Sequence, residues 1–144
     1  MGKLFISDEK LKDINKGVGY LKAAEEKGNT YAKILLGKVY LDLDSGIYDV
    51  EQGVRYLREL VEAGNEYACY YLGKEYVRKE SPYYNEAKGV QYLERAKEQG
   101  NDRAKYFVGK IYLDKISSEY SPELGLQYMT ELAESGNEYA QLKL

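Results

Sequence analysis

Residues 64–76 read Gly-Asn-Glu-Tyr-Ala-Cys-Tyr-Tyr-Leu-Gly-Lys-Glu-Tyr, and the framework of this segment recurs along the chain. Its opening Gly-Asn pair occurs four times, and each copy begins 36 residues after the previous one, at Gly28, Gly64, Gly100 and Gly136. Self-similarity at a fixed period of this size is typical of stacked supersecondary units. The period therefore predicts a repeat architecture in which each unit packs against its neighbours.

Each period carries the start and stop signals of two helices. The residues expected to cap the first helix of each repeat also lie 36 residues apart: Asp13, Asp49, Asn85 and Ser121. From Asp49 onward, apolar residues follow helical spacing until Gly64, which can adopt the left-handed conformation that ends a helix. Asn65 can then cap a second helix. We expect an all-α solenoid of stacked helix-turn-helix repeats, about 3.5 to 4 in number.

The predicted domain organisation follows from this period. We expect one solenoid domain over residues 1–144, with a remnant of a preceding helix and its loop in residues 1–12. The predicted repeats are 13–48, 49–84, 85–120 and a truncated 121–144.

Two further sets of residues keep the same period inside the predicted helices. Glycine costs ~1 kcal/mol in a helix interior compared with alanine, yet it recurs at Gly17, Gly37, Gly53, Gly73, Gly89, Gly109 and Gly125. We expect these glycines where two helix backbones cross closely. Tyrosines recur in register at Tyr20, Tyr56, Tyr92 and Tyr128. We expect them to pack between helices and to keep a hydrated hydroxyl edge.

Composition restricts the function. Lysine and arginine number 21 against 24 acidic residues, and the net charge of −3 does not favour nucleic-acid binding. Histidine is absent, and the single Cys69 allows neither an internal disulfide nor a multi-cysteine metal site. We expect Cys69 to be exposed, and the chain to be cytoplasmic and to have no membrane-spanning segment. We expect no enzyme activity, no cofactor and no metal, since no catalytic constellation or phosphate-binding loop is found.

The unit Gly-Asn-x-x-Ala-x-x-x-Leu-Gly-x-x-Tyr, read from Gly28 to Tyr40, resembles the Sel1-like repeat, a relative of the tetratricopeptide repeat. The unit returns at 64–76 and at 100–112, where Val108 replaces leucine, and a partial copy runs over 136–144. The resemblance implies a right-handed α-solenoid that acts as an adaptor or scaffold in protein complexes. The matching residues are structural, so the resemblance assigns no binding chemistry to them.

Positions that vary between repeats are free to contact a partner. In related solenoids the first helices line the concave side, so we expect a peptide or protein to bind there at Arg55, Arg58, Gln91, Glu94 and Gln127. The alternative that these are ordinary solvated positions stays open. A periodic acidic set comprises Glu26, Glu62, Glu98 and Glu134. We expect its members to pair with lysines of neighbouring repeats.

The leading interpretation is thus a non-catalytic protein-protein interaction module or adaptor. The alternative is a positioning module cut from a larger multidomain enzyme or mobile-element protein. Gly-Asn-Glu-Tyr-Ala at 64–68 and 136–140 is similar to tracts in Sel1-repeat proteins of Gram-positive mobile elements, which implies a bacterial source. Self-association through open solenoid ends is a further expectation.

Overall fold

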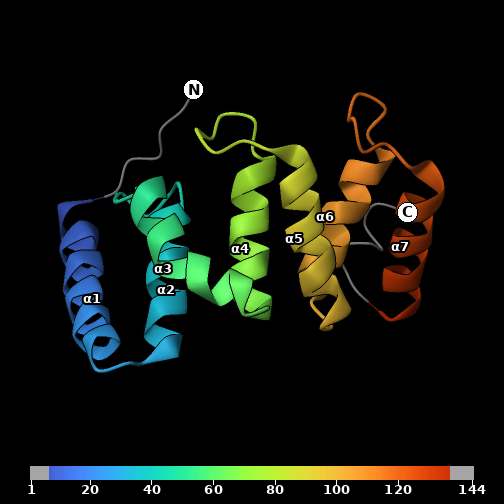
Figure 1. Ribbon diagram of the computed structural model, residues 1–144. Helices are drawn as coiled ribbons and strands as arrows, with labels where there is room; N and C mark the ends of the chain where they lie inside the picture. The colour runs from blue at the N-terminus through green and yellow to red at the C-terminus, as the bar shows by residue number, and fades with distance from the viewer. Residues whose placement is uncertain (1–6, 137–144) are drawn as a thin grey trace. The chain divides into compact units, whose positions relative to one another are not determined.

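The computed structural model describes residues 7–136, and over that range it contains seven α-helices and no strand (Figure 1). The helices are α1 (Asp8–Glu26), α2 (Thr30–Leu41), α3 (Val50–Glu62), α4 (Glu66–Val77), α5 (Glu86–Glu98), α6 (Asp102–Leu113) and α7 (Pro122–Glu134). They form two compact units that meet in sequence between Ala63 and Gly64. The N-terminal unit contains α1 to α3, and the C-terminal unit contains α4 to α7. The predicted extent of the domain and its repeats stays a prediction.

The predicted turns at the Gly-Asn pairs are confirmed within the described residues. Gly28, Gly64 and Gly100 have φ values of +87°, +83° and +94°, a region that glycine enters without steric cost. The asparagine that follows each glycine caps the next helix, as Asn101 shows by accepting a hydrogen bond from the amide of Ala104 at 2.9 Å. The fourth predicted cap, Asn137, lies outside the described residues.

Three of the four predicted first-helix caps are found where the sequence places them. Asp49 Oδ1 accepts a hydrogen bond from Gln52 N at 3.2 Å, and Asn85 caps α5 in the same way. Ser121 occupies the cap position of α7 without a side-chain hydrogen bond, and Pro122 fills the first helical position.

The fourth, Asp13, is wrong as a cap because it lies inside α1. The helix begins at Asp8, where the side chain of Ser7 accepts a hydrogen bond from Lys10 N at 3.2 Å. Asp8 and Glu9 then complement the helix dipole in the first turn. These local signals start α1 earlier than the 36-residue period predicts.

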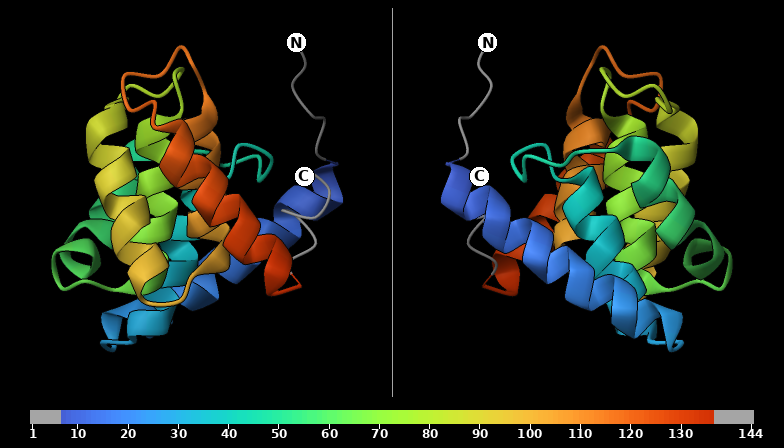
Figure 2. Two further views of the ribbon diagram at one scale, coloured as in Figure 1. Left: turned by 90° about the vertical axis from the view of Figure 1, so that its right-hand side faces the viewer. Right: turned by 90° about the vertical axis from the view of Figure 1, so that its left-hand side faces the viewer.

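A recurring backbone hydrogen bond sets where each repeat begins. The amides of Asp49, Asn85 and Ser121 each donate at 2.8 Å to the carbonyl of a tyrosine at the end of the preceding second helix. The intervening loops differ in sequence, yet the same bond closes them. In the C-terminal unit, loops 78–85 and 114–121 lie at the same edge of the helices (Figures 1 and 2).

Glycines explain how closely first and second helices approach. A Cβ added to Gly37 would lie 2.3 Å from Leu57 Cγ, and one added to Gly89 would lie 2.9 Å from the carbonyl oxygen of Gly73. The predicted close crossings are confirmed for six of the seven periodic glycines. The prediction is wrong for Gly17, because no described atom of another part of the chain lies within 4 Å of its added Cβ.

The core consists of small clusters between successive helices. Leu36 and Leu57 are fully buried in the N-terminal unit, and Leu93 and Val108 are fully buried in the C-terminal unit. Burial of each such side chain stabilises the fold by ~1.5–3 kcal/mol before entropy costs. The apolar columns that repeat in sequence therefore form the packing between helices.

Candidate functional site

Pairs of tyrosine rings join each second helix to the first helix that follows. The ring centroids of Tyr40 and Tyr56 are 6.0 Å apart, and those of Tyr112 and Tyr128 are 5.8 Å apart. The equivalent pair in α4 and α5 has a separation of 5.5 Å. The predicted packing role is confirmed for the periodic tyrosines of α3, α5 and α7. It is wrong for Tyr20, which is 68% exposed.

A polar cluster covers the tyrosine pair at the end of the C-terminal unit. Tyr112 Oη donates to Glu94 Oε2 at 2.6 Å, and Tyr128 Oη donates to the same carboxylate at 2.9 Å. Lys97 Nζ forms an ion pair with Glu94 at 3.1 Å and donates to Tyr128 Oη at 3.1 Å. Three helices, α5, α6 and α7, are thus joined at one carboxylate.

This cluster shifts the protonation equilibria of its members. Burial, followed by the hydrogen bond to Glu94, raises the pKa of Tyr112 far above its ordinary value. Burial lowers the pKa of Lys97, but the hydrogen bonds to Tyr128 and Glu94 outweigh it, so the pKa is raised overall. The cluster therefore keeps Tyr112 neutral and Lys97 charged.

In the N-terminal unit, the residue equivalent to Glu94 is Lys22, which also contacts a tyrosine. A hydrogen bond to Tyr40 raises the pKa of the Lys22 ammonium group. This varying position of the first helices therefore serves partly in packing. Glu94, which the sequence predicts as a partner-binding residue, lies half-buried and is already hydrogen-bonded within its own unit.

The two predicted arginines lie on α3 in the N-terminal unit and are both exposed. Arg55 Nη2 donates to Gln52 Oε1 at 2.6 Å, and its guanidinium carbon lies 4.6 Å from the centroid of the Tyr56 ring. Arg58 projects from the same helix three residues further on, which places the two charges on one side of α3.

The remaining predicted residues belong to the C-terminal unit. Gln91 is exposed on α5, three residues before Glu94. Gln127 is exposed on α7 and donates to Glu131 Oε2 at 3.2 Å. The five predicted residues thus divide between the two units, and their assembly into one binding groove stays a prediction.

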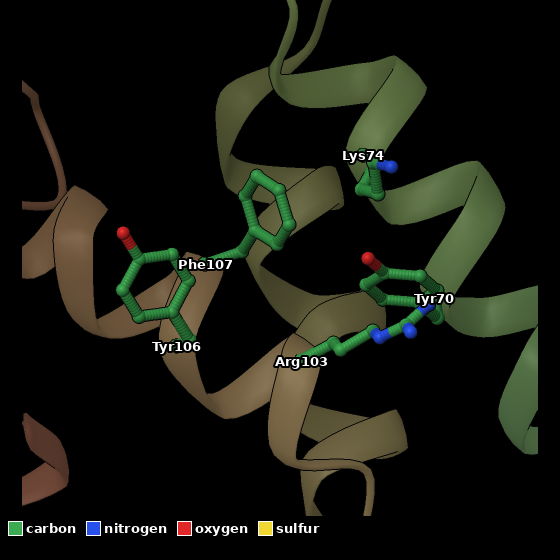
Figure 3. A pocket seen from close by; sticks show the side chains of 5 residues that line it. All are labelled: Tyr70, Lys74, Arg103, Tyr106 and Phe107. Carbon is green, nitrogen blue, oxygen red and sulfur yellow. The ribbon is translucent and has the colours of Figure 1, made fainter. Parts of the chain in front are cut away.

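A pocket of about 300 Å³ lies between α4 and α6, where the sequence analysis expects no site. Tyr70 and Lys74 line it from α4, and Arg103, Tyr106 and Phe107 line it from α6 (Figure 3). Arg103 extends toward Tyr70 in this view. The pocket thus combines three aromatic rings with two cationic side chains.

A signal for this pocket exists in the sequence. The positions of Tyr70 and Phe107 hold aliphatic residues in the first repeat, where Ile34 and Leu35 stand, and become aromatic in later repeats. These aromatic residues lie at positions that vary between repeats on the second helices, whereas the predicted binding residues lie at varying positions of the first helices.

Cys69 departs from its predicted exposure, because its side chain is fully buried in α4. Burial raises the pKa of its thiol, and the positive charge of Arg95 in α5, followed by a hydrogen bond with that side chain, offsets part of the rise. The equivalent positions hold Lys33 and Lys105, which remain partly exposed. The cysteine side chain is too short to reach the surface from this position, whereas a lysine side chain is long enough to bring its ammonium group to solvent.

The acidic set at the ends of the first helices also differs from expectation. Glu26, Glu62, Glu98 and Glu134 are all exposed. Within residues 7–136 none of them lies within ion-pair distance of a lysine or arginine, so the expected pairing is wrong there. Exposed ion pairs contribute little to stability, which is consistent with carboxylates that stay in solvent.

Neither a metal-binding cluster nor a helix long and apolar enough to cross a membrane is found in the described part of the chain.

No protein-family model matches the sequence, and no curated protein matches it significantly. Its fold is shared by solved structures, among them the following two. A Sel1 repeat protein from Oxalobacter formigenes is 26% identical with a TM-score of 0.65, and the match covers 90% of this chain and 97% of that chain. A protective antigen of uropathogenic Escherichia coli strains, which displays an SLR fold, is 25% identical with a TM-score of 0.71.

The match to the antigen covers 86% of this chain but 27% of the antigen. Both neighbours are Sel1-like repeat structures, the class that the Gly-Asn unit of this sequence resembles. The chain thus shares the fold of these Sel1-like repeat structures, and the predicted all-α solenoid class is confirmed.

Proposed function

We propose that this chain is a non-catalytic protein-protein interaction module that binds a peptide or the surface of a partner protein. One observation carries the proposal. The residues that repeat are used in packing between helices, whereas Arg55, Arg58, Gln91 and Gln127 vary between repeats and are exposed on first helices. In repeat arrays such exposed, variable positions form extended binding surfaces.

The experiment is capture of a partner with the intact chain, identification by mass spectrometry, and measurement of affinity against salt concentration. The test variant reverses two charges, Arg55→Glu with Arg58→Glu. A matched control, Lys79→Glu with Lys115→Glu, makes the same change in net charge on exposed loop residues. We expect the test variant to weaken binding by at least about tenfold and to reduce the salt dependence, with the control within about twofold.

Unchanged affinity and salt dependence in the test variant would remove Arg55 and Arg58 from the binding surface. Turnover of a small molecule by the purified chain would contradict the non-catalytic part of the proposal. Self-association through the ends of the array is tested by size-exclusion chromatography with light scattering, since a monomer at high concentration would contradict it.

The alternative, a positioning module within a longer protein, draws support from the antigen, because there a matching array is a minor part of a longer chain. The full open reading frame tests it. A reading frame without a further domain would contradict this alternative.

A further inference from the structure

The pocket between α4 and α6 has aromatic surface that the helices leave partly open. The Tyr70 and Phe107 rings are 6.1 Å apart, and the Phe107 and Tyr106 rings are 5.9 Å apart. Tyr70 is 4% exposed and forms a wall, whereas Tyr106 and Phe107 are half-buried and present ring surface to the pocket. The pocket has a volume of about 300 Å³. This volume is at the lower end of the range for small-molecule sites, which begins at ~300 Å³.

Positive charge lies around these rings. Lys74 Nζ is 5.1 Å from the centroid of Tyr70, and Lys110 Nζ is 5.4 Å from that of Tyr106. Both ammonium groups are thus within cation–π distance of rings that line the pocket. Arg103 is exposed, and no carboxylate of residues 7–136 lies within ion-pair distance of its guanidinium group.

A second pocket of about 480 Å³ adjoins the first, and Tyr70 and Arg103 line both. Glu66 and Asp102 line it near the start of α4 and α6. The combined surface is therefore cationic and aromatic toward one end and acidic toward the other. A nucleic-acid backbone carries a negative charge at every unit and would bring phosphates against these carboxylates, whereas a peptide can place one carboxylate at Arg103 and other residues beside Glu66 and Asp102.

We infer that this pocket binds an acidic peptide segment of a partner protein. An aspartate or glutamate carboxylate of the peptide accepts hydrogen bonds from Arg103, in the two-pronged geometry that guanidinium favours. An adjacent aromatic or aliphatic side chain packs against Tyr106 and Phe107. The inference rests on the proposed function as a protein-binding module, and it adds a second surface and the chemistry of its ligand.

The test is a selection from a random peptide library displayed on phage, using the whole chain as the target. The affinity of recovered peptides is then measured by fluorescence polarisation. We expect the recovered peptides to carry an acidic residue next to an aromatic or aliphatic one. Replacing that acidic residue of the peptide by its amide should weaken binding by at least about tenfold, and Arg103→Glu should have a similar effect. Lys115→Glu, a charge reversal of the same size on an exposed loop residue, should leave the affinity within about twofold.

The carboxylate-to-amide change in the peptide leaves the protein untouched, so a folding defect cannot imitate its effect. Recovered peptides without an acidic residue, or peptides whose affinity is unchanged by Arg103→Glu, would overturn the inference. Peptides sensitive to Arg58→Glu alone would overturn it while supporting the first-helix surface.

A selection that yields no peptide would also overturn the inference, and the capture experiment would still decide the proposed function. A dimer that Arg103→Glu dissociates would make a second copy the occupant and overturn the inference as well.

Discussion

Lys105 of α6 and Glu131 of α7 form an ion pair in which Nζ lies 2.7 Å from Oε1. The equivalent residues of the N-terminal unit, Lys33 and Glu59, are 3.6 Å apart. Each pair links a second helix to the first helix that follows. The period in the sequence therefore corresponds to a repeated contact between side chains.

The repeat between these two replaces the ion pair with Cys69 and Arg95. The thiol is buried, and the arginine contacts it from α5. The contact between the two helix positions is thus retained although the chemistry of the pair changes. Packing of neighbouring helices tolerates this change because apolar burial carries most of the stability.

We predict that Lys105→Ala raises the pKa of Glu131 toward its ordinary value. In the native chain the hydrogen bond from Lys105, followed by that from Gln127, holds the pKa of this carboxyl below its ordinary value. Carbon-detected NMR titration of the Glu131 carboxyl measures the change. Lys115→Ala, which removes an exposed loop lysine, is the matched control and should leave the pKa unchanged. Equal pKa values in the wild type and Lys105→Ala would contradict the prediction.

We predict that Gly89→Ala destabilises the C-terminal unit by about 1–3 kcal/mol. Its added Cβ would lie 2.5 Å from Val77 Cγ1 and 2.9 Å from the carbonyl oxygen of Gly73, and a backbone atom cannot move aside cheaply. Urea unfolding followed by circular dichroism measures the change in the free energy of unfolding.

Gly17→Ala is the matched control for this prediction. It lies within α1, and its added Cβ has no described neighbour within 4 Å, so alanine should stabilise the helix by up to ~1 kcal/mol. Changes of the same sign in the two variants would contradict the assignment of Gly89 to a helix crossing.

We predict that Tyr112 makes stability fall in alkaline solution. Because burial and Glu94 hold the pKa of Tyr112 above its unfolded value of 10.0, this contribution is complete below about pH 10. It is lost as the pH rises above that value, since the unfolded chain then ionises first. Urea unfolding from about pH 8 to about pH 11 should show a steeper loss for the wild type than for Tyr112→Phe.

Glu94→Gln separates the effect of the carboxylate from that of burial. Removing the negative charge should lower the pKa of Tyr112, so the alkaline loss should be less steep than in the wild type. A wild type and Tyr112→Phe with parallel pH profiles would show that Tyr112 has an ordinary pKa in the folded chain.

We predict that Asn101→Ala costs about 1 kcal/mol of stability. Asn101 is 9% exposed and its side chain accepts the hydrogen bond that caps α6, so the substitution leaves a buried amide without a partner. Ser121→Ala provides the comparison, because Ser121 caps α7 without a side-chain hydrogen bond and its loss should cost less. A larger loss for Ser121→Ala than for Asn101→Ala in urea unfolding would contradict this ranking.

The candidate binding residues were only partly accessible to sequence reasoning. Arg55 and Arg58 are exposed on one side of α3, as the helical spacing predicts. Glu94 occupies an equivalent varying position, yet it is held by two tyrosine hydroxyls from other helices. The spacing along a helix gives the side on which a residue lies, but not which side chains of neighbouring helices reach it.

The repeat, the starts of α2 to α7 and six of the seven predicted glycine crossings follow from the sequence alone. Gly64 ends a helix and Asn65 begins the next because both effects depend on backbone conformation and hydrogen bonds within a few residues. The burial of Cys69 and the pocket between Tyr70 and Phe107 become visible in the folded chain alone. These features depend on the distance between side chains of different helices, and the packing of the helices sets that distance.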